Sequence, residues 1–114
     1  MEIISILTSI KKLLGVEEDY THFDPDIIMH INSALMSLNQ LGIGPTTGFR
    51  IEDANAKWTD FITGRLDLEG VKTYVYLKVR LIFDPPQMGY LVEAIKDQIK
   101  ELEWRLNAQV EGVM

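Results

Sequence analysis

The sequence contains no cysteine, which excludes disulfide bridges, thiolate metal sites and cysteine nucleophiles. It has only two histidines, His22 and His30, and their spacing to the nearby aspartates matches neither an HExxH motif nor a comparable set of metal ligands. We therefore expect no metal and no other cofactor, and interpret each histidine as a partly buried or surface residue. The missing cysteine also fits synthesis in a reducing compartment such as the cytoplasm.

Long hydrophobic runs are absent as well. Residues 1–7 are mostly apolar but include Glu2, and Lys11 and Lys12 follow before a long run can build up. This pattern predicts neither a signal peptide nor a membrane-spanning segment. We expect no membrane partner.

Positive charge is scarce, with 11 lysines and arginines against 17 aspartates and glutamates and a formal net charge of -6. Lysine and arginine neutralise phosphates in non-specific nucleic-acid binding, so an acidic chain is a poor candidate for that role. The basic residues of the C-terminal half alternate with acidic ones, which is typical of a solvated helix face with intrahelical ion pairs. We expect DNA binding to be at most an alternative function.

The length of 114 residues and the hydrophobic content of 46% suit one folded domain, which we place at residues 1–114. Apolar residues recur at helical spacing over residues 5–14, where Gly15 is placed to end the helix. A second helix is expected to start with Asp24 as N-cap and Pro25 in the first helical position, and to stop at Gly42. Its apolar stripe consists of Ile27, Ile31, Leu35, Leu38 and Leu41.

Residues 71–83 fit two patterns. Their apolar residues alternate as in a β-strand and also recur at helical spacing. The stretch is longer than a usual strand, and Asp67 offers an N-cap just upstream, so we predict a helix. After two prolines, a long helix is indicated by a seam with alternating spacings of three and four, resembling that of a coiled coil. The seam consists of Val92, Ile95, Ile99, Leu102 and Leu106.

Residues 42–57 contain three glycines and little periodicity, and predict a long loop with a brief hairpin around residues 49–51. Trp58 and Phe61 then share one face of a short helical turn that returns to the core. The predicted fold is therefore all-α, a compact bundle of four main helices with a long loop between the second and the third. Trp104 lies off the seam of the last helix, so it is either covered by the loop or reserved for a partner.

The stretch Asp84-Pro85-Pro86-Gln87 is similar to the active tetrapeptide of enzymes that methylate exocyclic amines, in which an aromatic residue takes the fourth place. Here that place holds Gln87, and the chain has no glycine-rich strand-to-helix turn for an adenosyl cofactor. Tandem prolines instead predict a corner between two helices. We expect no enzyme; one built on Asp84 or the histidines would need a pocket that gathers those side chains.

Five segments, in this order and spacing, carry a resemblance to a known family: KKLLGVEED, FDPDIIMHINSALMSLNQLGIGP, KWTDF, DLEGVKTYVYLKVRLIFDPP and IKDQIKELEWRLN. Over residues 10–107 the chain resembles the small head-tail connector proteins, also called adaptor or head-completion proteins, of long-tailed bacteriophages and prophages. The resemblance implies a small helical protein of the virion neck, made in the bacterial cytoplasm. It also implies a homo-oligomeric ring of about twelve subunits under the portal protein, joining the DNA-filled head to a stopper or tail-completion protein.

A closed ring requires two different contact patches on each subunit. We predict Phe49 and Arg50 in the long loop, and Tyr90 and Trp104 in the last helix, as interaction residues. DNA would pass the acidic ring only as cargo, because like charge disfavours adhesion to phosphates. A small helical DNA-binding or regulatory module is the alternative function.

Overall fold

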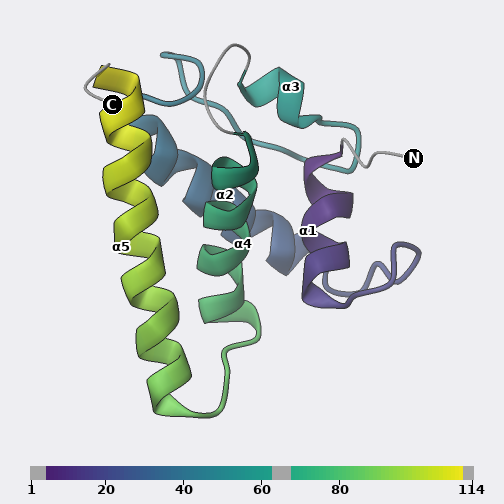
Figure 1. Ribbon diagram of the computed structural model, residues 1–114. Coiled ribbons are helices and arrows are strands. Elements are labelled where there is room, and N and C mark those ends of the chain that lie inside the picture. The colour runs from purple at the N-terminus through teal and green to yellow at the C-terminus, as the bar shows by residue number, and fades with distance from the viewer. Residues whose placement is uncertain (1–4, 63–67, 112–114) are drawn as a thin grey trace.

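The computed structural model describes residues 5–62 and 68–111, and these form an all-α fold (Figure 1). The prediction of four main helices is confirmed, including the helix over residues 71–83. A fifth, short helix of four residues follows the long loop. The helices are α1 (Ile6–Leu14), α2 (Asp24–Gln40), α3 (Trp58–Phe61), α4 (Leu68–Phe83) and α5 (Gly89–Glu111).

Helix α4 is the centre of the bundle. It packs against α1, α2 and α5, and α1 also packs against α2. In Figure 1, α2 crosses behind α4, and α5 runs antiparallel to α4 along one side of the molecule. The core consists of apolar residues from the inward stripes of these helices, which is the pattern expected of amphipathic helices. Its fully buried members on α2 and α4 include Ile27, Ile31, Leu35, Val71, Tyr74 and Val75.

Helix α1 begins and ends where the sequence indicates. The Ser5 hydroxyl accepts a hydrogen bond from the Thr8 amide at 3.2 Å and so caps the first turn. Gly15 closes the helix with a φ of 81°, a left-handed conformation that glycine adopts without a Cβ clash. The start of α1 is further held by the Ile6 amide, which donates to the Ala56 carbonyl at 3.0 Å.

The start of α2 differs from the prediction in one respect. Phe23, not Asp24, occupies the N-cap position, and no side chain caps the free amides there. Asp24 is the first helical residue, with Pro25 directly after it. The predicted cap is wrong because the Asp24 carboxylate is used by another partner, the ammonium group of Lys11.

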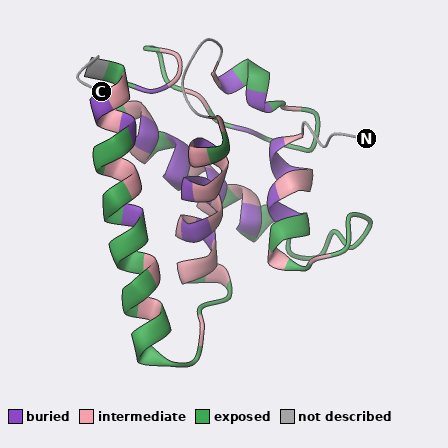
Figure 2. Ribbon diagram, in the orientation of Figure 1, coloured by how far each residue is buried: buried purple, intermediate pink, exposed green. Residues whose placement is uncertain are grey.

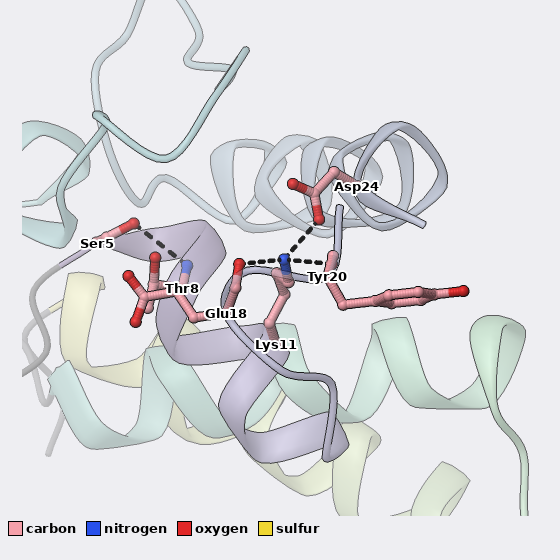
Figure 3. A network of polar contacts seen from close by, with 6 residues as sticks. All are labelled: Ser5, Thr8, Lys11, Glu18, Tyr20 and Asp24. Atoms are coloured by element: carbon pink, nitrogen blue, oxygen red, sulfur yellow. Dashed lines mark hydrogen bonds and ion pairs between the residues drawn. The ribbon is translucent and has the colours of Figure 1, made fainter. Parts of the chain in front are cut away.

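Lys11 is buried, with 2% of its surface exposed, and it joins three segments of the chain (Figure 3). Its Nζ donates to the backbone carbonyls of Glu18 and Tyr20, each at 2.9 Å. The same atom also forms an ion pair with the buried Asp24 Oδ1 at 2.8 Å. The ammonium group thus donates to two carbonyls, and the Asp24 carboxylate balances its charge. The contacts fix α1, the connection to α2, and the first turn of α2 relative to one another.

The long loop contains no hairpin at residues 49–51, so that prediction is wrong. The peptide groups of the loop bond instead to two asparagine side chains on α2. Asn32 Nδ2 donates to the Ile51 carbonyl at 3.0 Å, and the Ile51 amide donates to Asn32 Oδ1 at 2.7 Å. Asn39 Nδ2 donates to the Pro45 carbonyl at 2.6 Å. These side-chain bonds, rather than a second strand, satisfy the loop backbone and hold it along α2.

Helix α3 returns the chain to the core as predicted, since Trp58 and Phe61 are both buried. Trp58 Nε1 donates to the Ser9 hydroxyl at 2.9 Å, which ties α3 to α1. The Phe61 ring lies so close to Gly44 that a Cβ on this glycine would come within 2.5 Å of it. Gly44 also has a φ of 89°, so a larger residue at this position would be strained for two reasons.

The tandem prolines form the predicted corner between α4 and α5. Helix α4 ends at Phe83, and α5 begins after Met88, at Gly89. The predicted seam of α5 faces α4, because Ile99 and Leu106 are buried and Ile95 and Leu102 pack partly against the core. The proposed N-cap of α4, Asp67, lies outside the described residues.

One polar contact crosses the interface between α4 and α5. The Tyr74 hydroxyl is inside the bundle and donates to Glu103 Oε2 at 2.7 Å. Burial, followed by the hydrogen bond and the negative charge of Glu103, raises the pKa of Tyr74 well above its ordinary value of 10.0. Tyr74 thus stays protonated and keeps donating at pH values where a tyrosine in water ionises.

We expect Lys11→Met to lower the free energy of unfolding by about 2–4 kcal/mol, because it leaves two carbonyls and one carboxylate without their donor. Lys12→Met is the matched control, since Lys12 is exposed, and it should change stability by less than about 0.5 kcal/mol. Urea unfolding monitored by circular dichroism measures both. Equal losses in the two variants would contradict the assigned role of Lys11.

A second prediction concerns alkaline pH. Above about pH 10 the unfolded chain loses the Tyr74 proton while the folded chain keeps it, so stability due to this group falls as pH rises. Tyr74→Phe should therefore reduce the loss of unfolding free energy between about pH 9 and about pH 11. Urea titrations at several pH values measure this. The assignment fails if the wild type and the variant lose stability equally over this range.

Candidate functional site

The two histidines lie apart from other candidate metal ligands among the described residues. His22 is exposed, and its ring centroid lies 5.0 Å from that of Phe23 and 6.2 Å from that of Tyr20. His30 is half-buried on α2. Within residues 5–62 and 68–111, no three histidine, aspartate or glutamate residues come together as metal ligands would. The histidines have the surface or partly buried positions expected from the sequence.

Asp84 is exposed at the corner between α4 and α5 and lines a small depression of about 260 Å³. The other side chains of this depression come from the end of α1 and from α4, and include Lys12, Tyr76 and Arg80. Neither histidine lines it. The geometry therefore does not gather the groups on which an enzyme built on Asp84 and the histidines would depend.

Three of the six basic residues of α4 and α5 form intrahelical ion pairs, in line with the prediction. Three such pairs are present, at three- or four-residue spacing: Lys72 with Glu69, Lys96 with Glu93, and Arg105 with Glu101, at 3.6, 3.5 and 3.4 Å. Pairs of this kind contribute little stability but neutralise the cations locally. These helices do not offer a continuous basic surface for phosphates.

A groove of about 740 Å³ lies between α2 and the long loop. Two methionines on the outer face of α2 form much of it, Met29 and Met36, which are 57% and 63% exposed. On the loop side the groove is lined by Phe49 and Arg50, two of the predicted interaction residues. We call this hollow the α2 groove; its lining is Pro25, Ile28, Met29, Asn32, Ser33, Met36, Asn39, Thr47, Gly48, Phe49 and Arg50.

The shape of the α2 groove depends on the asparagine contacts that hold the loop. Asn32 and Asn39 bind the loop backbone, and the Phe49 ring packs on Phe61 with centroids 5.4 Å apart. Arg50 is exposed and makes no ion pair or hydrogen bond with any described residue. The groove is thus mostly apolar, with Arg50 as the one charged side chain in its lining, which suits an apolar helix that carries a carboxylate.

The outer face of α5 carries two exposed aromatic rings among charged residues. Trp104 and Tyr90 are each 69% exposed, although α5 packs its other face on α4. Figure 2 shows that α5 is exposed along most of its length. Of the two alternatives for Trp104, coverage by the loop is wrong; contact with a partner stays a prediction.

The structure places the predicted interaction residues on two different elements. Phe49 and Arg50 lie in the α2 groove, and Tyr90 and Trp104 lie on the outer face of α5. Sequence reasoning missed Met29 and Met36. The available signal was their position off the apolar stripe of α2 at a spacing of seven residues, which places both on one outward face.

Comparison with known proteins gives one match, to the family described as phage connector protein, over residues 6–113. The chain belongs to this family. It is therefore a structural connector protein of a phage virion. Such a protein interacts with other virion proteins at the neck. No curated protein and no solved structure matches the chain. Among the described residues, no helix of this connector is long and apolar enough to cross a membrane.

We expect Trp104→Ala to leave the helicity of the isolated subunit unchanged and its free energy of unfolding within about 0.5 kcal/mol of wild type. The exposed ring contributes little to the core, and alanine is the better helix former. Leu106→Ala, two residues further along α5 and buried, is the control and should cost about 2–4 kcal/mol. A loss of similar size in Trp104→Ala, measured by urea unfolding, would place Trp104 in the core.

Proposed function

We propose that this connector is the adaptor that forms a ring under the portal protein and joins the DNA-filled head to the stopper or tail-completion protein. The observation that carries the proposal is the presence of two separate surfaces with exposed apolar side chains, the α2 groove and the outer face of α5 with Tyr90 and Trp104, on one small subunit. A cyclic ring is built from heterologous contacts, in which one patch of a subunit meets a different patch of the next. Membership of the connector family supports the same role.

Charge supports the proposal from a second direction. The net charge is -6, and several of the basic residues on α4 and α5 are neutralised by glutamates on the same helix. A ring of such subunits offers little attraction to DNA, so DNA passes through it as cargo. The same feature gives no support to the alternative of a small DNA-binding module.

The test is association with the portal protein of the same phage. We expect a ring of about twelve subunits on the portal, measured by native mass spectrometry and by analytical ultracentrifugation. Trp104→Ala and Met36→Ala should each weaken this assembly by about tenfold or more, as truncation of a central interface residue does. Leu13→Ala is the matched control: Leu13 is 52% exposed but lies on α1, outside both surfaces.

The proposal fails if the wild-type protein shows no association with the portal at any concentration tested. DNA binding that weakens steeply with salt, measured by gel shift, would instead favour the alternative module.

A further inference from the structure

The outer face of α5 carries a regular pattern. Tyr90, Asp97 and Trp104 follow one another at intervals of seven residues, and all three are exposed. Seven residues are close to two helical turns, with a drift of only about 20°, so the three side chains form one stripe along the helix. Asp97 has no ion pair or hydrogen bond with any described residue. We call this set the α5 stripe.

The α2 groove matches the α5 stripe in length, and each surface has its charged residue near its middle. It extends along α2 from Pro25 to Asn39, as the α5 stripe extends from residue 90 to residue 104. At about 1.5 Å per residue, each spans about 21 Å. Asn32 stands midway along the groove, and it holds the peptide of Ile51, the residue after Arg50. Arg50 is therefore placed near the middle of the groove, as Asp97 is placed in the middle of the stripe.

We propose that the α5 stripe of one subunit lies in the α2 groove of the next subunit in the ring. This inference rests on the proposed function and names the surfaces that form its contact between copies. Asp97 pairs with Arg50 at the centre, and Tyr90 and Trp104 reach the two ends of the groove. Met29 and Met36 lie about 5 Å inside these ends, four residues from Pro25 and three from Asn39, and their flexible thioether chains can extend toward such rings.

The register does not depend on the direction in which the two helices run. Charged residues are central in both surfaces, and apolar residues flank them on both sides. Parallel and antiparallel docking therefore both bring Asp97 to Arg50 and an aromatic ring to each end of the groove. The helix lies in the groove with its stripe as the anchor, which is a common mode of helix recognition.

Charge favours a second copy of this chain as the occupant. Arg50 is the one charged side chain that lines the groove, and it lacks a partner among the described residues. The α5 stripe supplies an unpaired carboxylate at the matching position. The two surfaces lie on different elements, so the contact is heterologous and can be repeated around a ring.

Cysteine cross-linking tests the contact directly, because the natural chain contains no cysteine. Ser33→Cys places a thiol in the groove, and Lys100→Cys places one at the edge of the stripe. Neither variant removes Arg50, Asp97 or an aromatic ring. Lys12→Cys, an exposed lysine of α1, is the matched control for Lys100→Cys.

We expect mixtures of the Ser33→Cys and Lys100→Cys proteins to form a disulfide-linked heterodimer about tenfold faster than mixtures of Ser33→Cys and Lys12→Cys, because docking raises the effective thiol concentration. The reaction is followed on non-reducing gels, with the isolated proteins at high concentration and with the portal present. Equal rates for the two mixtures in both settings would overturn the inference.

Charge reversal tests the central pair. Arg50→Glu and Asp97→Arg should each weaken association between copies by about tenfold, since each places like charges opposite one another. The double variant, which restores opposite charges, should recover most of the lost association. Losses that simply add in the double variant would show that Arg50 and Asp97 do not meet.

These results separate the inference from the proposed function. Suppose a ring forms on the portal, but the thiol of Ser33→Cys cross-links to the portal and not to that of Lys100→Cys. This result overturns the inference and leaves the adaptor role intact. If the two cysteine variants cross-link but the wild-type protein binds no portal, the contact is supported and the adaptor role is ruled out.

Discussion

The arrangement of the bundle depends on a buried ammonium group. Lys11 has no access to water, so its charge is tolerated only because two carbonyls and the Asp24 carboxylate surround it. All three acceptors lie on the connection after α1 or in the first turn of α2. Because a misplaced acceptor would leave a buried charge unpaired, this contact restricts how α2 can leave α1. The direction of α2 in turn decides which of its faces meets α4 and which forms the groove.

The groove itself is a consequence of polar contacts on the outer side of α2. Asn32 and Asn39 satisfy peptide groups of the loop that have no secondary-structure partner of their own. The loop is thereby held at a fixed distance from α2, and the space between them stays open above Met29 and Met36. Two asparagine side chains thus turn an irregular segment into one wall of a binding surface. A loop free of these contacts would not present Phe49 and Arg50 in a defined place.

Sequence periodicity predicted the helices because burial follows the helical repeat. The seam of α5 and the proline corner were predictable for this reason, but the exposure of Trp104 was not, because coverage by the loop fitted the pattern equally well. The errors arose where a side chain distant in sequence replaced a local partner. Asp24 does not cap α2 because Lys11 binds its carboxylate, and residues 49–51 form no hairpin because Asn32 bonds to the peptide of Ile51. The α2 groove joins segments whose proximity local patterns do not encode.

Core and interaction surfaces use different faces of the same helices. On α5, the seam residues Ile99 and Leu106 face α4, while Trp104 points away from it and is left to solvent. A helix of 23 residues that packs on one main neighbour leaves most of its circumference free. In a chain of 114 residues the core is small, and the exposed Tyr90 and Trp104 rings contribute little to the fold of the isolated subunit. Their apolar area contributes free energy only when another surface covers it. The stability of the subunit and the strength of its contacts can therefore change independently of each other.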